Sequence, residues 1–220
     1  MIFDVLKSTL QFCLQIIAPP YCVYCKQFLA ADTILCRRCD ACIKPIVSHK
    51  IKLGYGYTMT VYAISSYIDP LRSLILTKGR SDIVVSNQLG KLLWQYTSIG
   101  YQEIDYFVPI PLHWARHMRR GFNQAHEIAT SLGECAHVPV INLLKRIKRT
   151  KYQSSCSRAE RVHNVKDAFV CTTDTMHYKN KHIFLIDDLM TTGATLQAAA
   201  QQLVVLQPAS INAIVVCRVV

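Results

Sequence analysis

The segment "IFLIDDLMTTGATL", residues 183–196, decides the fold of this protein. Its first residues, 183–187, are mostly apolar and predict a short buried strand. Two adjacent carboxylates, Asp187 and Asp188, close that run, and small or hydroxyl-bearing side chains follow them. The stretch "ATLQAAAQQLVVL", residues 194–206, then has the composition of a helix. The segment therefore predicts a strand, a polar loop and a helix in immediate succession.

The rest of the chain repeats this alternation of strands and helices. β-Branched and aromatic runs predict further strands, and amphipathic runs between them predict helices. Strands that alternate with helices are typical of a doubly wound parallel α/β sheet. The expected strands are 59–67, 105–111, 168–171 and 210–219, and the expected helices are 2–17, 69–78, 83–97 and 122–133.

The loop after the acidic pair has the chemistry of a sugar-phosphate site. Ligands of such sheets bind beyond the carboxyl ends of the strands, and the free amides at a helix N-terminus attract phosphate. Gly193 lets the backbone approach an anion closely, and the threonine hydroxyls add donors. The carboxylates would repel phosphate, so they are expected to face ribose hydroxyls, Mg²⁺ or a sugar carbon that becomes positive. The alternative is structural, with Asp188 capping a helix and Asp187 paired with a surface base.

Composition excludes several classes of protein. The 220 residues are 51% hydrophobic, which is enough for a substantial core. The most apolar N-terminal stretch, residues 1–18, contains Asp4 and Lys7 and therefore does not predict a membrane span. It has no basic start and no small-residue cleavage site, so we do not expect a signal peptide. We expect a cytoplasmic protein.

The charge is concentrated in one part of the sequence. The formal net charge is +11, and residues 116–166 hold eleven Lys or Arg and three Glu. Such a basic region favours nucleic acid or phosphorylated small molecules as partners. Its densest part, "KRIKRTK", predicts a contact with single-stranded DNA; the alternative is a solvated mobile loop that closes over the pocket. The basic residues of this cluster are Lys145, Arg146, Lys148, Arg149 and Lys151.

Ten cysteines in a cytoplasmic chain favour metal binding over disulfides. Two Cys-x-x-Cys pairs, Cys22 with Cys25 and Cys36 with Cys39, have the spacing of a structural Zn²⁺ site, although Cys42 competes with Cys39 for the fourth position. We expect a small zinc-binding domain over residues 1–50 and the α/β domain over 51–220. His113 and His117 have helical i, i+4 spacing, but without a third ligand they do not predict a metal site.

The motif "LIDDLMTTGATL" resembles the phosphoribosyl pyrophosphate (PRPP) signature of type I phosphoribosyltransferases. The resemblance implies that Asp187 and Asp188 hold the ribose hydroxyls at the catalytic centre and that Mg²⁺ accompanies PRPP. It also implies that the turn holds the 5-phosphate through Thr191, Thr192, Gly193, Ala194 and Thr195.

Further stretches resemble the ComF/GntX competence-protein family. They are "VPIPLHWARHMRRGFNQA" at 108–125, "YIDPLRSLILTKGRSD" at 67–82 and the pattern through Thr150, Gln153, Arg161, Asn164, Ala168 and Phe169. Cys156 stands where this family usually has Leu, and Ser81 lies in a shorter turn than is common. Neither departure touches the PRPP residues.

The resemblance implies a type I phosphoribosyltransferase-like domain behind a zinc ribbon. It implies a role in handling single-stranded DNA during natural transformation, beside other competence proteins such as a helicase or a recombination mediator, at the inner face of the membrane. An active transferase with an unknown acceptor is the alternative. Pyrophosphate contacts are expected from Arg116, Arg119, Arg120 and Lys78, and a mobile loop is expected to contain Gln153, Arg161 and Asn164.

Overall fold

The computed structural model describes residues 20–29, 33–76, 82–112, 118, 121–147, 167–173 and 176–220. The chain divides into two compact units, Met1–Ile43 and Lys44–Val220. This division comes earlier than the one expected after residue 50. The reason is that Pro45 already forms a bridge with Ser65, and His49 pairs with Val61, so both belong to the sheet of the larger unit.

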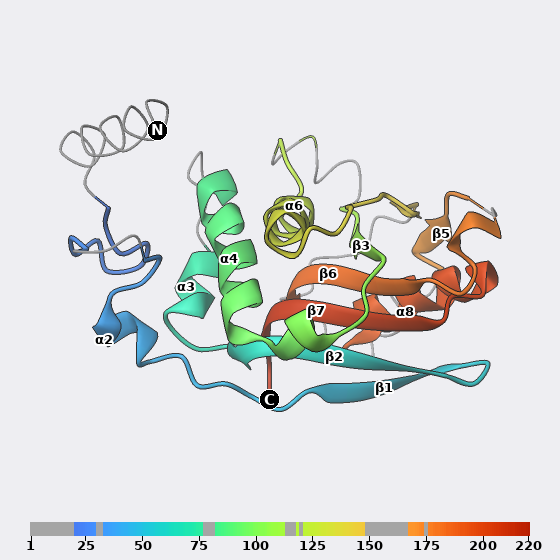
Figure 1. The fold of residues 1–220 in the computed structure, drawn as a ribbon, viewed down its shortest axis with the longest axis horizontal. Helices are drawn as coiled ribbons and strands as arrows, with labels where there is room; N and C mark the ends of the chain where they lie inside the picture. The colour runs from blue at the N-terminus through green and yellow to red at the C-terminus, as the bar shows by residue number, and fades with distance from the viewer. Residues whose placement is uncertain are drawn as a thin grey trace, which may run out of the picture. The chain divides into compact units, whose positions relative to one another are not determined.

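The larger unit is built on a five-stranded sheet (Figure 1). Four neighbouring strands run parallel, and an antiparallel edge strand completes the sheet. In spatial order the strands are β1 (His49–Gly54), β2 (Tyr57–Ser66), β7 (Ser210–Arg218), β6 (His182–Met190) and β3 (Tyr106–Pro109).

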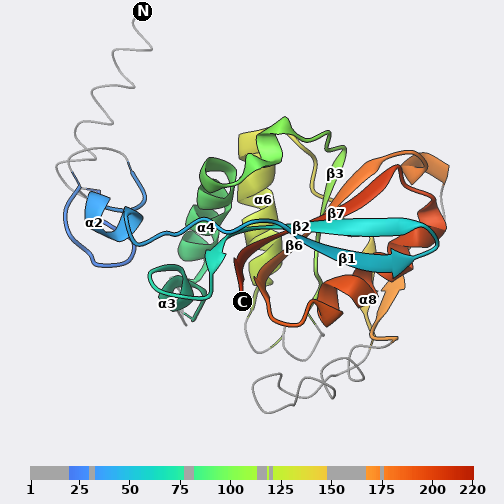
Figure 2. The ribbon, with the colours of Figure 1, turned by 90° about the horizontal axis from the view of Figure 1, so that it is seen from below.

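Helices cover both faces of this sheet, as Figure 1 and Figure 2 show. Successive strand residues point to opposite faces, so Ile183 and Leu185 enter the core beneath α8 (Ala194–Leu203). Phe184 lies on the other face, where its ring stacks on Tyr62 with the centroids 6.1 Å apart. Burial on both faces explains why the strands read as continuous apolar runs. The expected α/β fold with a mostly parallel sheet is confirmed.

The chain also contains a small second sheet, four further helices and three 3-10 turns among the described residues. A second, antiparallel sheet consists of β4 (Leu144–Arg146) and β5 (Phe169–Cys171). The smaller unit contains α2 (Arg37–Asp40). The other helices are α3 (Leu71–Leu76), α4 (Asp82–Tyr96) and α6 (Gln124–Ala136), with 3-10 turns at Ser98–Tyr101, Met176–Tyr178 and Val204–Leu206.

Two elements differ from the sequence prediction. The edge strand β1 was not expected, because its polar residues His49, Lys50 and Lys52 are exposed and only Leu53 is buried. Helix α6 does not end at Gly133 but continues to Ala136, and His137 supplies the left-handed cap (φ 56°). Within the described residues, no helix is both long enough and apolar enough to span a bilayer.

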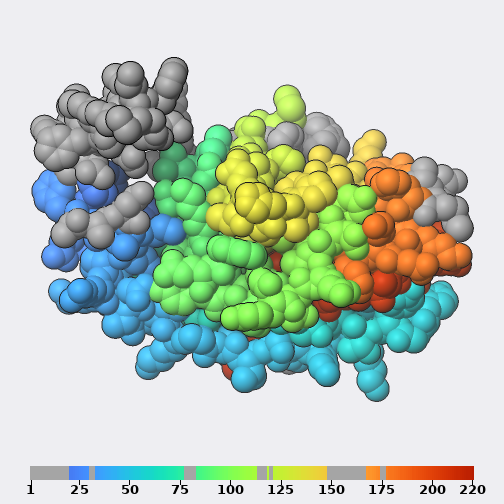
Figure 3. Space-filling view, viewed as in Figure 1, coloured from blue at the N-terminus to red at the C-terminus, as the bar shows by residue number. Residues whose placement is uncertain are grey.

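Helices α4 and α6 pack closely at Gly90. Their atoms lie next to each other in Figure 3. A Cβ atom at Gly90 would lie 2.7 Å from the Ile128 carbonyl oxygen and 2.7 Å from the Ser131 Cβ. Ser131 also donates its hydroxyl to the Asn87 carbonyl at 2.7 Å. This contact explains a glycine in the middle of a helix, where it costs about 1 kcal/mol relative to alanine.

We therefore predict that Gly90→Ala destabilises the protein, because the gain in helix propensity is smaller than the cost of overpacking, about 1–3 kcal/mol. Urea unfolding measures this loss. Gly100→Ala is the matched control, because the added Cβ would meet only the edge of the Trp94 ring at 3.3 Å. Equal unfolding midpoints for the two variants would contradict the account of this helix contact.

Candidate functional site

The acidic pair lies within β6, close to its carboxyl end. Asp187 pairs with Val215, and the strand continues to Met190, which pairs with Arg218. The predicted strand end at residue 187 was therefore too early. The Asp188 amide donates a 2.9 Å hydrogen bond to the Asp187 carboxylate, which fixes one carboxyl oxygen beside the backbone.

The turn after β6 joins the acidic pair directly to α8. Gly193 is the N-cap residue of α8 and has a left-handed backbone (φ 78°, ψ −3°). The Thr192 hydroxyl accepts a 3.3 Å hydrogen bond from the Ala194 amide, and the Gly193 carbonyl accepts one from the Gln197 amide at 2.8 Å. The turn therefore carries the acidic strand into the positive end of a helix within three residues.

Glycine is required at position 193 for two reasons. Its φ lies in the region that other residues rarely adopt. A Cβ there would also lie 2.7 Å from the Ile51 Cδ1 and 3.3 Å from the Met190 Cε. The edge strand β1, which carries Ile51, thus packs directly against the turn.

A pocket of about 260 Å³ opens at this edge of the sheet. The acidic pair, Thr191, Gly193, Ala194 and Thr195 line this pocket, whereas Thr192 lies in the turn outside the lining. The start of α6 contributes Asn123, whose amide donates a 3.0 Å hydrogen bond to the Ile110 carbonyl. The sequence did not reveal the apolar wall, which includes Tyr67, Ile75, Leu76, Ile110, Pro111 and Leu112.

Burial and a neighbouring negative charge raise the pKa of Asp187, the first residue of the acidic pair. Burial of the Asp187 carboxyl group, and next the negative charge of Asp188, raise its pKa well above the ordinary value. The Asp188 amide and the positive charge of Arg146 act in the opposite direction. A half-buried carboxyl group with a raised pKa in a cleft is a frequent mark of a functional site.

Arg146 lies in the pocket lining instead of on an exposed basic strip. In β4 the residues alternate between buried and exposed, so Leu144 and Arg146 face inward and only Lys145 faces solvent. Arg146 is 7% exposed, and its guanidinium carbon lies 5.2 Å from the Phe169 ring centroid. The sequence analysis grouped Arg146 with the other basic residues of 145–151 as a candidate contact with single-stranded DNA. An alternating strand pattern at 144–146 was the signal that would have separated them.

Several predicted residues lie outside the described residues. These include the candidate pyrophosphate contacts, the mobile-loop residues, most of the basic cluster and the histidine pair. They are Lys78, Arg116, Arg119, Arg120, Gln153, Arg161, Asn164, Lys148, Arg149, Lys151, His113 and His117.

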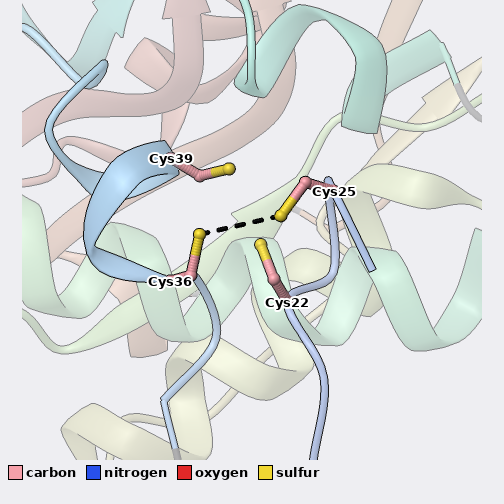
Figure 4. Close-up of side chains that lie close together, drawn as sticks. All are labelled: Cys22, Cys25, Cys36 and Cys39. Carbon is pink, nitrogen blue, oxygen red and sulfur yellow. Dashed lines mark hydrogen bonds between the residues drawn. The ribbon is translucent and has the colours of Figure 1, made fainter. Parts of the chain in front are cut away.

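The smaller unit contains a second candidate site, formed by four cysteines (Figure 4). The Sγ atoms of Cys22, Cys25, Cys36 and Cys39 all lie within 4.8 Å of one another, and those of Cys25 and Cys36 are 3.6 Å apart. Each Cys-x-x-Cys pair lies in a tight turn, or knuckle, that a backbone hydrogen bond closes. The Lys26 amide donates to the Cys22 carbonyl and the Asp40 amide donates to the Cys36 carbonyl, both at 2.9 Å. Four converging thiols can hold a tetrahedral Zn²⁺ ion and leave no open position for water.

The structure separates Cys39 from Cys42, which the sequence could not do. Cys39 is buried within the cluster, whereas the Cys42 thiol is exposed and donates to the Arg38 carbonyl at 3.3 Å. Burial acts to raise the pKa of the Cys22 thiol, but hydrogen bonds from the Cys36, Cys25 and Tyr24 amides lower it to about 6. A thiolate is the form that binds a metal.

Several known proteins resemble this chain over most of its length. The family described as "Phosphoribosyl transferase domain" matches residues 117–219, which include the acidic pair, the turn and α8. Competence protein F of Haemophilus influenzae is 28% identical over 86% of this chain and 80% of its own length. DNA utilization protein YhgH of Salmonella typhimurium is 32% identical over 71% of this chain and 70% of its own length.

Competence protein ComFC of Bacillus subtilis is 31% identical over 200 residues, which are 79% of this chain and 79% of that protein. Identity at this level over most of both chains is sufficient to assign a family. The chain therefore belongs to the ComF family of competence proteins, with a phosphoribosyltransferase domain behind an N-terminal four-cysteine unit.

Proposed function

We propose that the pocket at the end of β6 binds PRPP or a related ribose 5-phosphate, within a protein that handles single-stranded DNA during natural transformation. One observation supports the proposal of PRPP binding: the acidic pair and the N-terminal turn of α8 line the same pocket. Turn amides at a helix N-terminus suit the 5-phosphate. Carboxylates beside them suit the sugar hydroxyls, because hydroxyl groups donate to them.

We expect the pocket to disfavour a DNA strand as its direct ligand. A ribose with free 2- and 3-hydroxyls offers two donors to the acidic pair. In a DNA strand the 3-oxygen carries a phosphodiester, whose charge the carboxylates would repel. We therefore propose that the sugar-phosphate ligand and the DNA occupy different surfaces. Mg²⁺ is proposed to accompany PRPP, where it balances the charge of the pyrophosphate.

The DNA-handling role is supported by the relatives and by charge. The matched proteins are named competence proteins and a DNA utilization protein, and the net charge of +11 favours a polyanionic partner. Lys145 is exposed on β4, at the start of the basic cluster. We propose that the protein acts in the cytoplasm at the inner face of the membrane, beside a helicase or a recombination mediator.

An active transferase is the second candidate function. The acidic pair and the glycine-containing turn are the parts that a transferase would need to position the sugar and stabilise charge at its reacting carbon. Pyrophosphate release from PRPP, measured with nucleobases and oligonucleotides as acceptors, separates the candidates. Release that depends on an acceptor supports the transferase, and binding of PRPP without release supports the binding role.

We predict that Asp187→Asn combined with Asp188→Asn weakens PRPP binding about 10- to 100-fold, the expected loss when charged acceptors become neutral. Isothermal titration calorimetry measures the affinity. Asp105→Asn is the matched control, because Asp105 bonds to the Lys181 ammonium group and the His182 amide and does not line the pocket. An unchanged affinity of the double variant would refute the assignment of the acidic pair.

Asp187→Asn alone is predicted to stabilise the protein at neutral pH. An aspartate titrates near pH 3.9 when unfolded, and in the folded protein the pKa of Asp187 is raised, first by burial and next by Asp188. Between those two values the folded state binds more protons, so stability falls as pH rises. Asparagine removes this penalty, and its advantage in urea unfolding should shrink as pH falls toward about 4.

Asp105→Asn should behave in the opposite way. Burial acts to raise the pKa of Asp105, but the His182 amide and Lys181 lower it overall. Its contribution to stability is therefore present above the unfolded pKa and is lost as pH falls through the folded value.

If Asp187→Asn were less stable than the parent at pH 7, the account of its buried charge would be wrong.

We also propose that the four-cysteine unit holds one structural zinc ion. Cys39→Ser should abolish stoichiometric zinc in the purified protein and destabilise the smaller unit, because metal binding supplies folding free energy there. Cys42→Ser is the matched control and should retain one zinc per chain. Atomic absorption measures the metal, and full zinc content in the Cys39→Ser protein would exclude this ligand set.

A further inference from the structure

The zinc-binding unit exposes an aromatic pair, Tyr21 and Phe28. Tyr21 is 56% exposed and Phe28 is 73% exposed, which is unusual for phenylalanine in a globular protein. Tyr24, in the same knuckle, is 37% exposed. Neighbouring exposed aromatic side chains often mark a surface that binds a partner.

Backbone pairing aligns the two rings of the aromatic pair. Tyr21 and Phe28 are antiparallel bridge partners. The flanking hydrogen bonds run from the Cys22 amide to the Gln27 carbonyl (2.8 Å) and from the Leu29 amide to the Pro20 carbonyl (2.9 Å). This is the non-hydrogen-bonded type of pair, in which opposed side chains project to the same side and are closest together.

The four-cysteine cluster anchors the aromatic pair, and the positive charge of Lys26 lies beside it. Cys22, next to Tyr21, is fully buried in the four-cysteine cluster, so the knuckle anchors one strand of the bridge. The Lys26 ammonium group lies 5.4 Å from the Tyr21 ring centroid, and it donates to the Val23 carbonyl at 2.8 Å. Two opposed rings, with a lysine held over one of them, match the needs of a base that stacks on the open ring while its phosphate lies near the positive charge.

We infer that the aromatic pair is a stacking platform for the bases of single-stranded DNA, formed by residues other than those of the sugar-phosphate pocket and of the basic cluster. The inference rests on the proposed DNA-handling function and names the surface that performs it. Formal charges nearly balance over residues 20–43, where the basic residues are Lys26, Arg37 and Arg38 and the acidic residues are Asp32 and Asp40. Affinity there should therefore come from stacking more than from phosphate contacts.

The test uses the full-length protein and a fluorescent single-stranded thymidine oligonucleotide of about 20 nucleotides. Anisotropy titrations at several salt concentrations give the affinity and its salt slope. Tyr21→Ala with Phe28→Ala should weaken binding about tenfold or more while leaving the salt slope unchanged. Gln in place of Lys145, Lys148 and Arg149 should instead reduce the slope, because it removes phosphate contacts.

Matched variants and probes separate stacking from other effects. Tyr55→Ala, at a residue 88% exposed in the larger unit, controls for the loss of an exposed ring. Phe28→Trp should retain affinity and Phe28→Leu should not, because leucine keeps apolar area but has no ring. An abasic oligonucleotide of equal length should bind the parent as weakly as the normal oligonucleotide binds the double variant. Zinc content and urea unfolding confirm that each variant is folded.

The outcomes are distinguishable. If the parent binds the oligonucleotide and the folded double variant binds it equally well, the platform is refuted and the DNA-handling proposal stands. If the parent does not bind at all, both fail. If Phe28→Leu binds as the parent does, or if the double variant loses only its binding to phospholipid vesicles, the aromatic pair serves an apolar partner or a membrane surface, and the inference is overturned.

Discussion

The left-handed backbone of Gly193 is the constraint on which the site depends. It reverses the chain at the end of β6 so that the first turn of α8 starts beside the acidic pair. The contact with Ile51 shows that this turn is supported from the edge of the sheet, because no Cβ atom fits between them. The edge strand β1, which β2 joins to the rest of the sheet, is therefore part of the framework that holds the turn in place.

The acidic pair is held at a cost to stability. Two carboxylates adjacent in sequence, one of them with a raised pKa, are an unfavourable arrangement for a strand end that serves only packing. The positive charge of Arg146 offsets part of this cost from the small sheet of β4 and β5. Because Arg146 also packs on Phe169, the packing of that sheet determines where the charge lies. Such a balance is characteristic of groups retained for binding.

The sequence predicted the features that depend on local pattern. The strands at β2, β3, β6 and β7 follow from their apolar runs, and the spacing of the cysteines predicts the metal site except for the choice between Cys39 and Cys42. Features that depend on tertiary contact were not accessible. Helix α6 continues past Gly133 because that glycine serves a close approach to the Val138 carbonyl oxygen and not a helix end. Likewise β5 pairs with β4 instead of joining the main sheet, and this pairing buries Arg146.

The most direct test of the central claim is the chemical shift of the turn amides. If the turn grips a phosphate while the acidic pair holds hydroxyls, ribose 5-phosphate added to isotope-labelled protein should shift the amide resonances of Gly193, Ala194 and Thr195. Ribose alone, which lacks the phosphate, should leave them in place. Equal spectra with and without ribose 5-phosphate at saturating concentration would contradict the account.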